Sequence, residues 1–114
     1  MILPLTTLEQ FNELWRGYDD NGNKGPQQFL IWFSAAWCGP CQRMEKKRLE
    51  EAAYEMSLPF YYCDEVVNRE TIDYAGITSF PTFVMYTPKN EVGRRMSADT
   101  TKVCQWIKKC RLMQ

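Results

Sequence analysis

The WCGPC stretch at residues 37–41 decides how this chain is interpreted. It follows an unbroken apolar run, Phe29–Phe33, which is bounded by turn-forming residues and is typical of a strand covered on both faces. Two residues separate the cysteines, so their sulfurs can meet in a small ring when oxidised. Such a pair could hold a metal, form a structural crosslink or exchange electrons with another protein.

The residues around the two cysteines favour electron exchange. Residues 42–56 predict a helix that begins at the motif, and the free backbone N–H groups at its start favour the thiolate form of Cys38. Pro40 suits the first turn of a helix, and Gly39 leaves room for a partner's backbone. Trp37 is expected to form one wall of the approach.

Composition and charge exclude several classes of function. The 114 residues, of which 45% are hydrophobic, fit one domain spanning residues 1–114. Fourteen basic residues balance fourteen acidic ones, so we expect neither nucleic acid nor an anionic membrane as a partner. The chain has no histidine, which excludes Ser–His and Cys–His catalysis and Cys/His zinc sites. Because there is also no second CxxC pair, we expect no metal site.

The cysteine count and the first residues favour a cytoplasmic protein. Five cysteines are an odd number in a chain large enough to build a core without crosslinks, which fits a reducing compartment. The opening MILPLTT has no positively charged region and no apolar stretch of signal-peptide length. No segment approaches the roughly 18 apolar residues that span a bilayer, so we expect no membrane association.

Strand and helix signals alternate along the chain. Thr6 and Glu9 have the spacing of a capping box for a first helix, and Asn68 and Asp99 can cap two later helices. This α/β order needs a mixed sheet with helices on both faces. The expected strands are 2–5, 29–33, 59–63, 82–86 and 91–96; the expected helices are 7–17, 42–56, a brief one from 68 to 76 and a last one from 99; residues 18–27 form a surface loop.

The motif after an apolar strand, together with Pro81 in the later stretch SFPTF (79–83), resembles the thioredoxin family over nearly the whole chain. This resemblance implies the thioredoxin fold, a mixed central sheet of about five strands flanked by about four helices. It also implies that Pro81 is cis and faces the disulfide. Phe80, Trp37, Gly39 and Pro40 then belong to the motif and the substrate groove.

The resemblance also implies a reaction. Cys38 corresponds to the attacking cysteine and Cys41 to the resolving one, so the chain would reduce protein disulfides through a mixed disulfide and support cell redox homeostasis and electron transport. An NADPH-dependent thioredoxin reductase would reset the pair. The chain has no nucleotide-binding glycine pattern, so we expect no cofactor, and we expect a monomer. Two alternatives stay open: a binding or redox-sensing module with little turnover, and an oxidase or isomerase.

Two core positions depart from the family pattern. Trp32 occupies the place of the family's buried carboxylate, and Tyr62 that of its lysine partner. We interpret this exchange as a different packing of the core, because removing one charge alone would leave the other buried without a partner. Cys41 must then lose its proton to water or to Glu45, Asp64 or Tyr62.

Five further positions carry specific expectations. Lys46 takes the place of the proline that kinks the family's motif helix, which predicts a straighter helix. Phe80 is bulkier than the usual residue before the cis proline, and could narrow the groove or pack inward. Cys63 and Cys110 are expected to be buried, and Cys104 to be more exposed.

Overall fold

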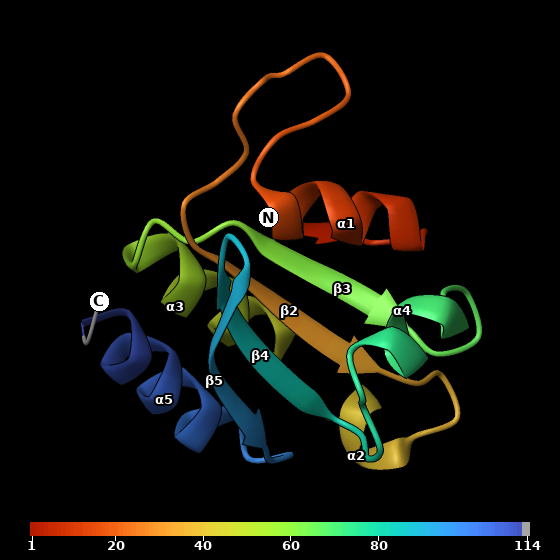
Figure 1. Ribbon diagram of the computed structural model, residues 1–114. Coiled ribbons are helices and arrows are strands. Elements are labelled where there is room, and N and C mark those ends of the chain that lie inside the picture. The colour runs from red at the N-terminus through yellow and green to blue at the C-terminus, as the bar shows by residue number, and fades with distance from the viewer. Residues whose placement is uncertain (113–114) are drawn as a thin grey trace.

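A five-stranded mixed sheet organises the chain in the computed structural model, which describes residues 1–112 (Figure 1). The strand order is β1-β3-β2-β4-β5. Strands β1, β3 and β2 run parallel to one another, and β4 runs antiparallel to both of its neighbours, β2 and β5. Every residue of central strand β2 is buried, as its apolar run predicts. The strands are β1 Ile2–Pro4, β2 Phe29–Ser34, β3 Phe60–Asp64, β4 Thr82–Thr87 and β5 Asn90–Met96.

Helices cover both faces of this sheet, so the predicted α/β fold class is confirmed. Figure 1 shows α3 and α5 on one face and α1 and α4 on the other, with the short α2 beyond the end of β2. Residues 1–112 contain five helices where about four were expected, because the helix after the motif is divided. The helices are α1 Leu8–Arg16, α2 Gly39–Gln42, α3 Lys46–Glu55, α4 Arg69–Tyr74 and α5 Thr100–Leu112.

Side chains of β2 alternate between two core layers, as the period of a strand requires. Leu30 and Trp32 pack with the residues of α3 and α5. Ile31 and Phe33 pack instead with those of α1 and α4. Because β2 is fixed from both sides, its C-terminal end is a rigid support for the WCGPC motif that follows.

The motif helix is broken, which contradicts the expected straighter helix over residues 42–56. Helix α2 ends at Gln42, and α3 begins at Lys46 without a proline. Between them, the Glu45 N–H donates to the Thr100 hydroxyl at 3.2 Å, a residue on the distant helix α5. A partner from another helix thus takes the amide that a continuous helix would use internally.

Thr100→Val is therefore expected to lower the free energy of unfolding by about 0.5–1.5 kcal/mol, the usual net contribution of one buried hydrogen bond. Urea unfolding monitored by circular dichroism measures the change. Thr101→Val is the matched control: its hydroxyl accepts a hydrogen bond from Arg48 on the exposed surface, where substitutions usually change stability by less than about 0.5 kcal/mol. Equal losses in the two variants would contradict this role of Thr100.

The capping box of helix α1 lies one residue later in the sequence than predicted. Thr7 is the cap: its hydroxyl accepts from the Gln10 N–H at 3.1 Å, and the Gln10 side chain accepts from the Thr7 N–H at 3.1 Å. The predicted pair Thr6 and Glu9 is wrong by one position because glutamine serves as well as glutamate in this motif. The helix ends at Gly17, whose φ of 93° suits glycine.

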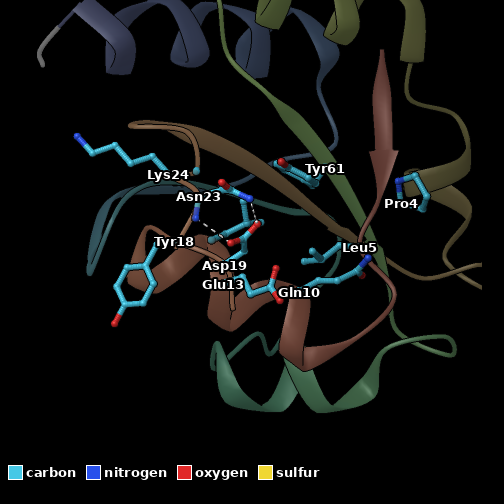
Figure 2. A pocket seen from close by; sticks show the side chains of 11 residues that line it. Pro4, Leu5, Gln10, Glu13, Tyr18, Asp19, Asn23, Lys24 and Tyr61 are labelled. Carbon is cyan, nitrogen blue, oxygen red and sulfur yellow. Dashed lines mark hydrogen bonds between the residues drawn. The ribbon is translucent and has the colours of Figure 1, made fainter. Parts of the chain in front are cut away.

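The loop after α1 is ordered by the Asp19 carboxylate, which accepts hydrogen bonds from the N–H groups of Asn21 and Asn23 and from the Asn23 side chain. These bonds lower the pKa of Asp19. Figure 2 shows Asp19 and Asn23 facing each other beside a hollow between this loop, α1 and β3, with Lys24 and Tyr18 extending outward. The predicted surface loop is thus confirmed, and the hydrogen bonds to Asp19 give it a defined conformation.

Candidate active site

Cys38 and Cys41 form a disulfide at the start of α2, with their Cα atoms 5.3 Å apart. Cys38 caps the helix, and the Cys41 N–H lies 3.3 Å from the Cys38 sulfur. Pro40 occupies the first turn, as the sequence predicts. Helix α2 has only four residues, so the amides of this single turn, and not a long helix dipole, face the Cys38 sulfur.

Both cysteines of the pair are buried, Cys41 more completely than Cys38. The exposed fraction of Cys38 is 6%, and that of Cys41 is 1%. The Cys38 sulfur lies 3.7 Å from the carbonyl oxygen of Phe80, and the Phe80–Pro81 peptide bond is cis, as the resemblance implies. Strand β2 and the segment before β4 therefore bring Cys38 and Pro81, 43 residues apart in sequence, to one end of the sheet.

A groove of about 580 Å³ is lined by Trp37, the residue before Cys38, and by Phe80, whose carbonyl contacts the Cys38 sulfur. Its lining combines Trp37 and Phe80 with Arg69 and Asp73 of α4 and with residues 76–79. Trp37 is 68% exposed, and its ring meets that of Phe80 edge to face, with centroids 5.8 Å apart. Phe80 is half-buried: it lines the groove and also packs inward against two core clusters, so both expected roles are seen.

A chain of polar contacts holds Trp37 in place. The indole N–H donates to Glu65 at 2.7 Å, and Arg69 joins Glu65 and Asp73, each at 3.0 Å. The hydrogen bond from Trp37, followed by that from Arg69, lowers the pKa of Glu65. The sequence analysis missed Glu65, which lies in the turn before α4, so the helical spacing of four residues marks only the ion pair of Arg69 with Asp73.

Comparison with protein families decides the assignment. The model of the family described as Thioredoxin matches residues 11–109, a range that includes both cysteines and Pro81. The chain belongs to the thioredoxin family. Family membership and the Cys38–Cys41 pair together support thiol–disulfide oxidoreductase function.

Individual thioredoxins are similar over different shares of the chain. Over 62 residues it is 40% identical to a thioredoxin of Geodia cydonium, which covers 54% of this chain and 58% of that protein. Over 98 residues it is 30% identical to thioredoxin H2-1 of Oryza sativa subsp. japonica, covering 86% of this chain and 68% of that protein. The crystal structure of oxidised mitochondrial thioredoxin 3 from Saccharomyces cerevisiae has a TM-score of 0.77 at 27% identity, covering 95% of this chain and 94% of that one.

Trp32 and Tyr62, which depart from the thioredoxin pattern, form part of an aromatic cluster beneath the motif. Trp32 stacks on Phe83 at 5.5 Å and on Phe60 at 6.3 Å, and meets Tyr62 edge to face at 5.1 Å. The Lys46 ammonium lies 5.8 Å from the centre of the Tyr62 ring. Ring packing has therefore replaced the family's buried charges, in agreement with the interpretation from the sequence.

The candidate acceptors for the Cys41 proton have other partners. The Glu45 carboxylate pairs with Arg48 at 2.9 Å, and the Asp64 carboxylate accepts from the N–H groups of Val66 and Val67. Within residues 1–112, neither carboxylate is hydrogen-bonded to Cys41. The proposal that one of these groups, Tyr62 or water receives the proton stays a prediction.

The three cysteines outside the motif differ in burial. Cys63 and Cys110 are buried, as expected, and Cys104 is half-buried, with its sulfur 3.6 Å from the Arg48 carbonyl. Burial raises the pKa of the Cys63 thiol to about 12, with a smaller contribution from the Asp64 carboxylate. Cys63 therefore stays protonated near neutral pH and is not a nucleophile.

Alkaline pH is expected to destabilise the fold through Cys63. In the unfolded chain this thiol loses its proton near its ordinary pKa of 9.0, whereas in the folded protein it keeps the proton up to about 12. The unfolded state thus binds fewer protons between these values, and the free energy of unfolding falls by up to about 1.4 kcal/mol per pH unit as pH rises.

Cys63→Ala should flatten this fall, measured by urea unfolding at a series of pH values above neutrality. Tyr61, whose pKa burial also raises, is present in both proteins, so its effect cancels in the comparison. Identical pH slopes for the two proteins would contradict the assignment to Cys63.

Within residues 1–112, the structure gives little support for a metal site or a membrane-spanning helix. The carboxylates close enough to share a metal ion in residues 1–112 are those of Glu9, Glu13 and Asp20, and Asp20 already pairs with Arg16 at 2.8 Å. No cysteine belongs to this group. Nor does any helix within residues 1–112 have the length and apolar character needed to cross a membrane.

Proposed function

We propose that this thioredoxin-family chain reduces protein disulfides with Cys38 as the nucleophile and Cys41 as the resolving thiol. The observation that carries this proposal is the position of the Cys38 sulfur, which lies 3.7 Å from the carbonyl of the groove residue Phe80, while Cys41 is the more deeply buried of the pair. A substrate can reach only the first sulfur, and only the second is held close enough to displace the substrate afterwards.

The reaction proceeds in two exchanges. The Cys38 thiolate attacks one sulfur of the substrate disulfide, that disulfide breaks, and the departing substrate sulfur takes up a proton. The Cys41 thiolate then attacks the Cys38 sulfur, releasing the second substrate thiol and closing the Cys38–Cys41 disulfide. The substrate gains two electrons and two protons, and the Cys38–Cys41 dithiol loses them.

The groove and the backbone amide contribute separately to this reaction. The Cys41 N–H at 3.3 Å stabilises negative charge on the Cys38 sulfur before attack. Phe80 and Trp37, whose rings meet edge to face, offer apolar surface to the residues that flank the substrate disulfide. The Glu65–Trp37 hydrogen bond fixes the orientation of the indole.

We place the protein as a monomer in the cytoplasm, in electron transport for cell redox homeostasis, with an NADPH-dependent thioredoxin reductase as its electron donor. Family membership supports the reductase and the disulfide substrates. The odd number of cysteines, in a chain large enough to build a core without crosslinks, supports a reducing compartment. One relative is named as a mitochondrial thioredoxin, so fractionation of the native cells is the direct test of the compartment.

Reduction of insulin by dithiothreitol tests the proposed activity. The protein should accelerate insulin precipitation in proportion to its concentration. Cys104→Ser is the matched control, since it removes a half-buried thiol outside the groove and should keep the full rate. A protein that binds insulin but leaves the rate at that of dithiothreitol alone would instead be a binding module.

A further inference from the structure

A group of exposed basic residues follows the cysteine pair in the chain. Arg43 comes directly after α2, Lys46 and Lys47 begin α3, and all three residues are exposed. None of the three forms an ion pair within residues 1–112. The other two charged residues of this segment, Glu45 and Arg48, pair with each other at 2.9 Å. Arg43, Lys46 and Lys47 therefore form a patch of three unpaired positive charges, which we call the basic patch.

Arg43 brings one of these charges to the cysteine motif itself. Its backbone N–H donates to the Gly39 carbonyl at 3.1 Å. Its side chain folds back over Gly39, where a Cβ atom would lie only 3.1 Å from a guanidinium nitrogen. Gly39 directly follows Cys38, so a substrate that reaches the Cys38 sulfur also comes close to this cation.

Helix stability does not explain the two lysines of the basic patch. Lys46 and Lys47 lie in the first turn of α3, where the positive end of the helix dipole disfavours cations. This turn has no acidic residue, and the Glu45 side chain does not cap it. Lys46 does contact the Tyr62 ring, but within residues 1–112 neither Lys47 nor Arg43 has a contact of this kind. The patch and the helix start thus add to one positive field beside the cysteine pair.

The groove on the other side of Trp37 has a different charge balance. Its charged lining residues, Arg69 and Asp73, pair at 3.0 Å, and Arg69 also pairs with Glu65. No residue of the basic patch lines this groove. Attraction for an acidic substrate segment must therefore come from the basic patch, and the unequal charge of the two surfaces gives such a substrate a preferred orientation.

We propose that the basic patch selects protein disulfides that carry an acidic segment next to one of their cysteines. Carboxylates of that segment would form charge-assisted hydrogen bonds with the Arg43 guanidinium and with the ammonium groups of Lys46 and Lys47. Opposite charges also raise the rate at which the partners meet. This inference rests on the proposed function: the patch decides which disulfides are used, and the exchange at Cys38 and Cys41 is unchanged.

Three peptides that differ only in the residues flanking one intramolecular disulfide test the selection. The flanks consist of glutamate, glutamine or lysine. Dithiothreitol keeps the protein reduced, chromatography measures the peptide thiols formed, and the rate without protein is subtracted. At about 20 mM salt we expect kcat/KM for the glutamate peptide to exceed that for the lysine peptide at least about fivefold. At about 0.5 M salt this ratio should approach one, because salt screens exposed charges.

A double substitution, Arg43→Gln with Lys47→Gln, should lower the ratio of glutamate to lysine peptide at least about threefold at low salt. Lys24→Gln with Lys109→Gln is the matched control, because it changes the net charge equally and should keep the wild-type ratio. Lys24 belongs to the loop of residues 18–27, which lies at the opposite end of the molecule from α2, and Lys109 to the last turn of α5 (Figure 1).

The glutamine peptide separates the failure of this inference from the failure of the proposed function. If it is reduced, three results would overturn the selection alone: equal kcat/KM for the glutamate and lysine peptides, an unchanged ratio in the Arg43 and Lys47 variant, or an equal loss in the control. If none of the three peptides is reduced faster than by dithiothreitol alone, the proposed function and the selection are both wrong.

Discussion

Replacing Cys38 with serine is expected to reduce insulin reduction to the rate of dithiothreitol alone. A serine hydroxyl cannot form the mixed disulfide, and Cys41, which is buried beside it, cannot reach a substrate in its place. Cys41→Ser is expected to fail at the next step. Its Cys38 attacks normally, but no thiol releases the product, so the substrate remains covalently attached.

Non-reducing electrophoresis and intact-mass measurement distinguish the two failures. The Cys41→Ser protein should carry one substrate chain per molecule, removed by excess dithiothreitol, and the Cys38→Ser protein should carry none. Cys63→Ala, at a buried thiol outside the pair, should turn over normally. Adducts on Cys38→Ser, or turnover by it, would show that a different sulfur is the nucleophile.

Trp32→Ala is expected to lower the free energy of unfolding by about 3–5 kcal/mol, the range for truncating a large aromatic residue in a core. Trp32 is 1% exposed and packs between Phe60 and Phe83, so the substitution leaves a cavity bounded by rigid rings. Equilibrium unfolding in urea, with the disulfide kept in one redox state, measures the loss.

Trp37→Ala is the matched control, because the same side chain is removed from an exposed position. Its stability should change by less than about 1 kcal/mol, since mainly one surface hydrogen bond to Glu65 is lost. Its rate of insulin reduction should fall, because one wall of the groove is missing. Similar losses of stability in the two variants would show that the packing around Trp32 contributes no more to stability than the exposed side chain of Trp37 does.

The sequence predicted the features that depend on local pattern. The apolar run at 29–33, the turn between the two last strands and the caps Asn68 and Asp99 each carry their own signal, and all lie where they were expected. The cysteine pair and Pro81 could be assigned because residue type and spacing alone identify the motif. Strand and helix ends differ from the prediction by one or two residues, except for the helix expected over residues 42–56, which is divided and resumes only at Lys46.

Features that depend on contacts between distant residues could not be predicted in this way. At the break before α3, the Glu45 N–H donates to the Thr100 hydroxyl, and these two residues are 55 positions apart. The contact of Trp37 with Glu65 spans 28 residues. Nothing in the local pattern around either residue marks its partner, so the structure was needed to find both.

Arg94 also limits which sequence changes the groove lining can accept during evolution. It ties strand β5 to the carbonyls of Ala75 and Gly76, where the groove-lining segment 76–80 begins, and this segment passes directly through Pro81 into β4. Exchanging one side chain within 77–80 leaves both ends of the segment in place: the hydrogen bonds from Arg94 at its start and the entry into β4 at its end. An inserted residue would shift one of these two ends out of register. Descendants of this protein should therefore acquire new partners by point mutation, with the length of this loop unchanged.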